Sequence, residues 1–146
     1  MKKPNIGHYL KVINTIVTDS EKVGEEMNPS YEIVRHAIDD GKVSDLTVEQ
    51  LTEIKNQFST GTEHYRVMEN ALTQLKAPVK VLGIHKKLEK AFNDYVEGCQ
   101  EMVDSIDAEH GKVDSEAFDL SEAKQDAATD GISFCIQRIT QIIMNK

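Results

Sequence analysis

The sequence predicts an all-α fold, an antiparallel bundle of four long helices in up-down-up-down order. Three observations predict it. Apolar residues recur at alternating spacings of three and four in four separate segments, as in helices that pack at a shallow angle. Capping and breaking residues lie between these segments. The 146 residues include only 3 Pro, 8 Gly and 5% aromatics, which favours helices over strands. We therefore expect residues 1–146 to form a single helical-bundle domain.

The first segment carries an apolar stripe with one polar interruption. Its members are Ile6, Tyr9, Ile13, Ile16, Ser20, Val23 and Met27, flanked by Leu10 and Val17. The pair Asn28-Pro29 interrupts the pattern, and proline removes a backbone donor and disfavours the α conformation at the residue before it. We expect the first helix to be kinked or broken near Pro29, with Asn28 as a cap and residues 31–38 as a shorter helical piece.

The second segment has the most regular stripe. Its members are Leu51, Ile54, Phe58, Gly61, Tyr65, Met68, Leu72 and Leu75. Residues 47–50, Thr-Val-Glu-Gln, match a capping box that opens this helix. Asp40-Gly41 separates it from the first helix, and Ala77-Pro78 ends it.

The third and fourth segments complete the bundle. Their stripes are Val81, His85, Leu88, Phe92, Tyr95, Cys99, Met102 and Ile106, and then Ala128, Ile132, Cys135, Ile139 and Ile142. Between them, residues 108–120 form the longest connection, in which Val113 and Phe118 are expected to fold back onto the end of the bundle. Asp119 or Ser121 can cap the last helix.

The predicted topology sorts the charges by pole, because the ends of the first and third helices meet the starts of the second and fourth. The acidic pole collects Asp39, Asp40, Asp45, Glu49, Asp104, Asp107, Glu109, Asp114, Glu116, Asp119 and Glu122, and the basic pole collects Lys2, Lys3, Lys11, Lys76, Lys80, Lys86, Lys87, Lys90, Arg138 and Lys146. The third helix starts basic and ends acidic, against its own dipole. The poles are either solvated ends or surfaces that attract partners of opposite charge.

The motif search assigns no catalytic residue, no metal ligand and no cofactor. Residues 107–118 resemble a calcium loop, but Gly111 falls at position 5 and Phe118 at position 12, where an EF-hand needs oxygen ligands. The Glu-x-x-His pairs of a di-metal bundle do not occur. The glycines form neither a P-loop nor a dinucleotide-binding motif.

Three side chains on the stripes carry reactive groups. His85 is the only histidine on a stripe, and we interpret it as a hydrogen-bonded core residue rather than a ligand or base. Cys99 and Cys135 lie about 9 Å out of step on antiparallel helices. We interpret both as small buried hydrophobes rather than a disulfide.

Two hypotheses for the function follow. The first is a non-enzymatic bundle that acts through protein contacts with a partner or a second copy, using an apolar flank of the first and fourth helices that includes Val12 and Phe134. The second is a bundle that binds a small molecule or metal, as an enzyme or as a binding protein, with His85 and Tyr65 or Tyr95 in an internal pocket.

Charge and composition bear on the expected partners and cellular compartment of the protein. The formal net charge of -8 argues against nucleic-acid binding, which needs clustered Lys and Arg. No stretch approaches the length of a membrane span. The basic N-terminus is not followed by an apolar run of signal-peptide length, so we expect a cytoplasmic protein.

Overall fold

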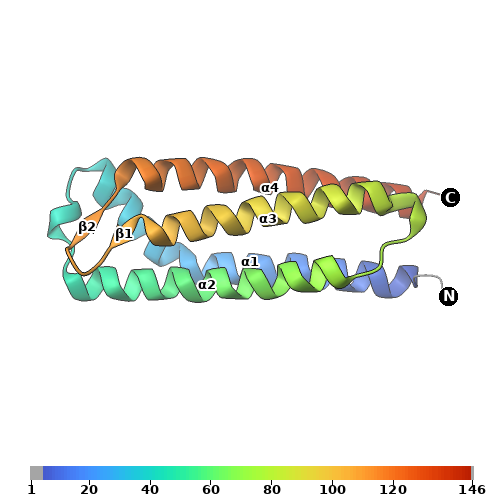
Figure 1. The fold of residues 1–146 in the computed structure, drawn as a ribbon, viewed down its shortest axis with the longest axis horizontal. Helices are drawn as coiled ribbons and strands as arrows, with labels where there is room; N and C mark the ends of the chain where they lie inside the picture. The colour runs from blue at the N-terminus through green and yellow to red at the C-terminus, as the bar shows by residue number, and fades with distance from the viewer. Residues whose placement is uncertain (1–4, 146) are drawn as a thin grey trace.

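The computed structural model describes residues 5–145 and confirms an all-α, four-helix fold (Figure 1). The elements are α1 (Ile6–Asp39), η1 (Val43–Asp45), α2 (Val48–Gln74), η2 (Val79–Val81), α3 (Leu82–Asp104), β1 (Ile106–Asp107), β2 (Lys112–Val113) and α4 (Ser115–Met144). The helices alternate in direction along the bundle, as predicted, so the starts of α2 and α4 lie at the same pole as the ends of α1 and α3. Lys2, Lys3 and Lys146 of the predicted basic pole lie outside the described residues.

Local sequence explains most helix ends. Thr47 and Gln50 form the predicted capping box at the start of α2: the Thr47 side chain accepts from the Gln50 amide, and the Gln50 side chain accepts from the Thr47 amide. The Asn5 side chain caps α1 by accepting from the amide of His8. The turn after α1 is made by Gly41, whose φ of 66° lies in the left-handed region that favours glycine.

The connection before α4 differs from the expectation. A short antiparallel hairpin pairs Ile106 with Val113 and Asp107 with Lys112, which the sequence did not predict. The caps proposed at Asp119 and Ser121 are wrong, because α4 already begins at Ser115, and Asp114 caps it by accepting from the Ala117 amide. Phe118 is nevertheless fully buried at this end of the bundle, as expected.

Helix α1 runs across Pro29 without a break, so the expectation that Asn28 caps a second helical piece is wrong. Proline leaves one helical carbonyl without its usual amide donor, which weakens the helix locally. Side chains on both sides of Pro29 are nevertheless buried, including Val23, Ser30 and Val34. Tertiary packing supplies most of the stability of a helix, and here it holds both parts of α1 in a single element.

The core consists of two clusters along the bundle. The cluster at the half that carries the chain termini contains Tyr9, Ile13, Ile16, Val23, Tyr65, Met68, Leu72, Val81, Leu88, Phe92, Val96, Cys99, Cys135, Ile139 and Ile143, and the cluster at the hairpin half contains Val34, Leu51, Ile54, Phe58, Met102, Val103, Ile106, Ala108 and Phe118. No described helix has the length and apolar character needed to cross a membrane.

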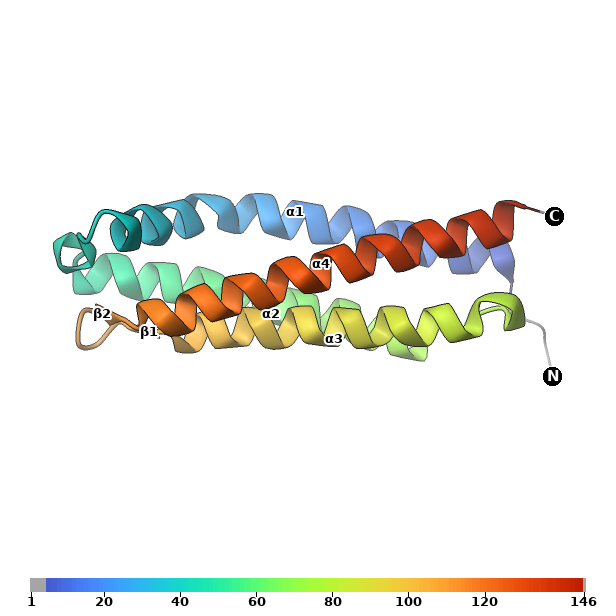
Figure 2. The same cartoon turned by 90° about the horizontal axis from the view of Figure 1, so that it is seen from above.

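The four helices are not equally spaced. At Gly98 of α3 an added Cβ would lie 2.9 Å from Gln125 Cγ of α4, and at Gly131 of α4 it would lie 3.4 Å from Ala91 Cβ of α3. Two glycines therefore let α4 approach α3 closely, and α4 packs far more on α3 than on α1. Figure 2 shows α1 and α4 diverging toward the hairpin end.

Candidate functional site

A mostly apolar groove lies between α1 and α4, which pack on each other much less than α3 and α4 do. Its main cavity has a volume of about 250 Å³. The cavity is lined by Ile13, Ile16, Val17, Ser20 and Glu21 of α1, Tyr65 and Leu72 of α2, Leu88, Phe92 and Tyr95 of α3, and Thr129, Ile132, Ser133 and Ile136 of α4. All four helices contribute, but α1 and α4 form the two walls.

A second hollow of about 140 Å³ shares Tyr95 with the first and extends it toward the hairpin. Its lining residues are Gly24, Met27, Asn28, Tyr31, Phe58, Thr62, Tyr95, Cys99, Met102 and Gln125. We call the two hollows together the α1–α4 groove. Along α1 the groove runs from Ile13 to Tyr31, a length of about 27 Å at the rise of an α-helix.

Two tyrosines place hydroxyl groups at the floor of the groove. The Tyr65 hydroxyl donates to the backbone carbonyl of Ser20 at 3.2 Å, and the Tyr95 hydroxyl donates to the Tyr65 hydroxyl at 3.4 Å. Their rings pack edge to face with centroids 4.9 Å apart. This pair ties α1, α2 and α3 together and places two hydroxyl groups against the apolar residues of the floor.

The ionisable groups at the floor stay neutral near pH 7. Burial raises the pKa of the Cys99 thiol to about 12, and it also raises the pKa values of Tyr65 and Tyr95. A thiol acts as a nucleophile only as its thiolate. The Cys99 thiol therefore lacks the thiolate form that a nucleophile needs.

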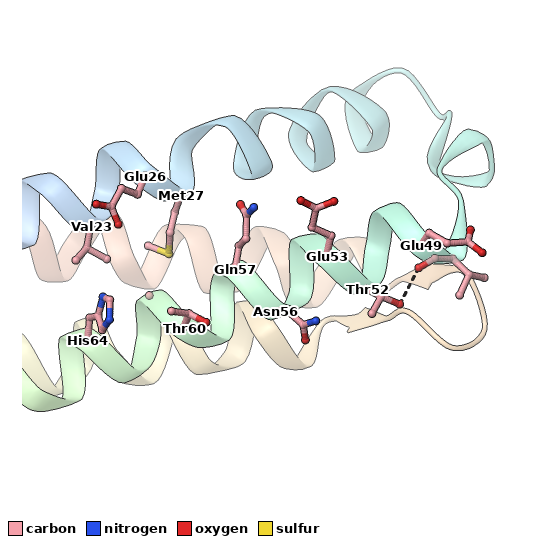
Figure 3. Close-up of a pocket in the computed structure, with 12 residues that line it drawn as sticks. Val23, Glu26, Met27, Glu49, Thr52, Glu53, Asn56, Gln57, Thr60 and His64 are labelled. Atoms are coloured by element: carbon pink, nitrogen blue, oxygen red, sulfur yellow. Dashed lines mark hydrogen bonds between the residues drawn. The ribbon is translucent and has the colours of Figure 1, made fainter.

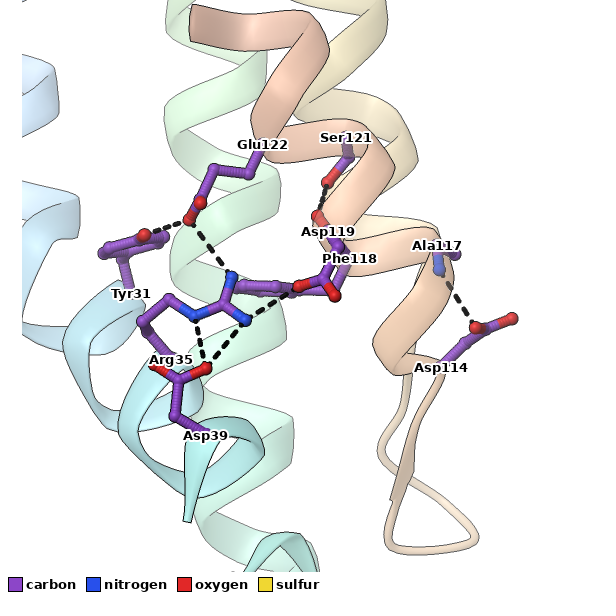
Figure 4. Close-up of polar contacts among 9 residues, drawn as sticks. All are labelled: Tyr31, Arg35, Asp39, Asp114, Ala117, Phe118, Asp119, Ser121 and Glu122. Atoms are coloured by element: carbon purple, nitrogen blue, oxygen red, sulfur yellow. Dashed lines mark hydrogen bonds and ion pairs between the residues drawn. The ribbon is translucent and has the colours of Figure 1, made fainter. Parts of the chain in front are cut away.

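An ionic cluster closes the groove at its hairpin end (Figure 4). Arg35 of α1 pairs with Asp119 of α4 at 2.7 Å and with Asp39 at 3.1 Å. It also lies 3.4 Å from Glu122 of α4, which accepts a hydrogen bond from Tyr31. Because the Arg35 guanidinium also lies 5.2 Å from the centroid of the Phe118 ring, one side chain joins α1 to the start of α4. Three carboxylates of the acidic pole are therefore partly neutralised by an arginine that the pole prediction omitted.

A wider groove lies between α1 and α2 (Figure 3), with a volume of about 680 Å³. It is lined by Val23, Glu26 and Met27 of α1 and by Val48, Glu49, Thr52, Glu53, Asn56, Gln57, Thr60, Gly61 and His64 of α2. We call it the α1–α2 groove. Its floor is the Met27 thioether against Gly61, and its sides are polar and acidic. Within the described chain, no three His, Cys, Asp or Glu side chains come together as a metal site.

His85 does not line either groove. Its ring is buried, with Nδ1 2.9 Å from the Tyr9 hydroxyl and Nε2 3.1 Å from the carbonyl of Leu72. Both ring nitrogens have protein partners, which confirms the interpretation as a hydrogen-bonded core histidine. The prediction that His85 shares a pocket with Tyr65 or Tyr95 is therefore wrong: both tyrosines line a cavity, but His85 does not.

The residues of the predicted apolar flank do not meet. Val12 is partly buried against the core and lines a hollow with Val67 and Ala71 of α2. Phe134 is 65% exposed and lies two residues from Ile132, about 200° away around α4. Because Ile132 faces the α1–α4 groove, Phe134 points away from it. Val12 and Phe134 thus belong to different faces of the bundle.

Cys99 and Cys135 are buried free thiols, as predicted. The sequence does not predict the groove, although several of its lining residues, including Ser20, Tyr95 and Ile132, lie on the predicted stripes. Those three are only partly buried, in contrast to most stripe neighbours. Ser20 is one sequence signal for the groove, since it is a polar residue at a core position of α1.

No protein-family model, no curated protein and no solved structure matches this chain.

Proposed function

We propose that this protein is a non-enzymatic binding module that acts through protein contacts, and that its α1–α4 groove accepts apolar side chains of a partner. The observation that carries the proposal is the hollow with a mostly apolar lining between α1 and α4. Ile13 and Ile16 are buried at its floor, and Val17, Ile132 and Ile136 are partly buried along its walls. A concave, mostly apolar hollow with a polar rim is typical of binding sites.

The shape of the groove supports a protein partner over a small molecule. It consists of two hollows, of about 250 and 140 Å³, that follow one another along α1. The groove is also elongated between two helices rather than closed around one point. Such a surface fits a row of side chains from a partner element.

The chemistry of the floor supports binding over catalysis. The tyrosine hydroxyls already donate to Ser20 and Tyr65, and the raised pKa of Cys99 keeps the thiol protonated. A partner that fills the groove pays only a small desolvation free energy at the floor, because no charged group has to be buried there. Apolar burial can then contribute about 25 cal/mol per Å² before the costs of association.

A helical peptide with Leu on one face and neutral Gln elsewhere tests the proposal. We expect saturable binding to the wild-type chain by fluorescence anisotropy. Val17→Trp and Ser133→Trp, which fill the groove from α1 and α4, should each weaken it at least about tenfold. Val79→Trp, at an 87% exposed site outside the groove, is the matched control and should bind normally.

Circular dichroism of each variant confirms that the bundle remains folded. The proposal is overturned if the folded tryptophan variants bind the peptide as well as the wild type does. It is also overturned if the wild-type chain shows no saturable binding.

A further inference from the structure

We infer that the partner element is an amphipathic helix whose apolar face is flanked by Lys or Arg residues. This inference rests on the proposed function and adds the chemistry of the partner. It is carried by the charges on the two rims of the α1–α4 groove, by the helical spacing of its walls and by its length.

The rim of α1 is acidic. Glu21 lines the groove, and Glu25 and Glu32 follow at spacings of four and seven residues, which keeps all three on one face of the helix. Glu32 lies 3.1 Å from His36. Within the described chain, Glu21 and Glu25 form no ion pair, so their charges face solvent beside the groove.

The rim of α4 is acidic at its hairpin half. Glu122 and Asp126 continue into Thr129 and Ser133 at spacings of four, three and four residues, so all four share one face. Glu122 is held by Tyr31 and Arg35. Asp126 is exposed and forms no ion pair within residues 5–145.

The basic residues of these two helices do not balance the rims. Arg35 is already surrounded by three carboxylates, and Lys124 pairs with Glu97 and Glu101 of α3 on the other side of α4. Lys11 and Lys22 are exposed on α1, but neither lines the groove. Lys22 lies about 100° around the helix from Glu21 and about 60° from Glu25. A partner at the groove therefore meets a negative border.

The walls favour a helical partner over an extended one. Ile13, Ile16, Val17 and Ser20 of α1 and Thr129, Ile132, Ser133 and Ile136 of α4 line the groove at helical spacings of three and four. An extended strand gains affinity by pairing its backbone with a free sheet edge, and both walls here are helices whose backbone groups are internally paired. A helix satisfies its own backbone groups and offers side chains at matching spacings.

The groove also sets the length of the partner. The α1 wall spans about 27 Å, and the α4 wall from Gln125 to Ile136 spans about 17 Å. A helix of about 12 to 18 residues covers this range. Lys or Arg on both sides of its apolar face would approach Glu21, Glu25 and Asp126, which raises both the specificity and the rate of association.

Three peptides with the same Leu face and Lys, Gln or Glu flanks test the inference. We expect the Lys peptide to bind at least about tenfold tighter than the Glu peptide at low ionic strength, with the Gln peptide between them, and the difference to shrink at about 0.3 M salt. The triple variant Glu21→Gln, Glu25→Gln and Asp126→Asn should remove most of this preference. A Lys peptide with its leucines scrambled around the helix should bind weakly.

A second triple variant is matched in charge but lies in the α1–α2 groove: Glu26→Gln, Glu49→Gln and Glu53→Gln. It should leave the preference for the Lys peptide intact. Equal losses in both triple variants would overturn the inference, because the attraction would then come from the overall net charge or from the other groove.

The outcomes also separate this inference from the proposed function. Equal binding of the three peptides, lost in Val17→Trp, would overturn the basic partner and leave an apolar docking groove. Failure of all three peptides to bind would overturn both. Sedimentation that shows a dimer in the wild type and a monomer in Val17→Trp would instead assign the groove to a second copy of this chain.

Discussion

Gly98 of α3 and Gln125 of α4 lie in close contact. A Cβ atom at Gly98 would come 2.9 Å from Gln125 Cγ and 3.3 Å from the backbone nitrogen of Gln125. The Gln125 side-chain amide also donates to the Gly98 carbonyl at 3.3 Å. This contact holds α4 against α3. It therefore contributes to the separation of α4 from α1 that opens the groove.

Gly98→Ala is expected to destabilise the protein by about 1 to 3 kcal/mol, because the added methyl group pushes on the backbone of α4. Urea unfolding measures the change. Gly83→Ala is the matched control: a Cβ at Gly83 of α3 meets nothing within 4 Å. Alanine should stabilise the protein there by about 0.4 to 1 kcal/mol, since it favours the helix. Equal effects of the two substitutions would contradict the close packing of α3 on α4.

The hydrogen bond between Tyr9 and His85 gives a second prediction. Tyr9→Phe leaves Nδ1 of the buried His85 ring without a partner and should lower the free energy of unfolding by about 1 to 3 kcal/mol. In a His85→Leu background, Tyr9→Phe should lower the free energy of unfolding much less. The Tyr9 hydroxyl has already lost its hydrogen-bond partner there, so removing it breaks no further hydrogen bond. A double-mutant cycle measures the coupling. A coupling energy near zero would show that the two side chains do not interact.

The Arg35 cluster gives a third prediction. The Arg35 side chain is 18% exposed and contacts three carboxylates, so Arg35→Met should cost about 1 to 2 kcal/mol, above the value for a simple surface pair. Screening by added salt should reduce that cost. Arg66 is 43% exposed and pairs with Glu63, and Arg66→Met should stay within about 0.5 kcal/mol. Chemical unfolding at low and high salt measures the loss of stability in each variant. Equal losses in Arg35→Met and Arg66→Met would rule out a cooperative cluster.

Most of the fold could be predicted from the sequence because it depends on local patterns. The stripe of Leu51, Ile54 and Phe58 reports one buried helical face, and the Thr47 capping box fixes where that helix begins. Pro29 shows where local reasoning stops. Its cost to the helix is local, but the burial that keeps α1 continuous comes from other helices.

The groove could not be predicted in the same way. Ser20, Tyr95 and Ile132 belong to the same stripes as fully buried residues, and their exposure depends on the distance between α1 and α4. That distance is set by contacts at Gly98 and Gly131, far from α1 in the sequence. Two glycines within long amphipathic helices do carry a signal, since alanine would favour the helix at both positions. Only the structure shows which helices they bring together.

The tyrosines give the last prediction. Burial, with a further contribution from Glu89, raises the pKa of Tyr9 to about 12, and burial and Glu122 raise the pKa of Tyr31 to about 12. Burial also raises the pKa values of Tyr65 and Tyr95. These four are the only tyrosines, and the chain has no Trp, so tyrosinate absorbance reports on them directly.

In the unfolded chain all four phenols should titrate near their ordinary pKa of about 10. The folded state binds these phenolic protons more tightly than the unfolded chain does. The contribution of the four tyrosines to the free energy of unfolding is therefore fully present below about pH 10, and it is lost as the pH rises from there through about 12. We expect little tyrosinate absorbance from the folded protein at pH about 10.5, and much more in urea. Tyr9→Phe should flatten the loss of stability with pH, since it removes one of the raised groups. A folded protein that titrates like the unfolded chain would contradict the burial of these side chains.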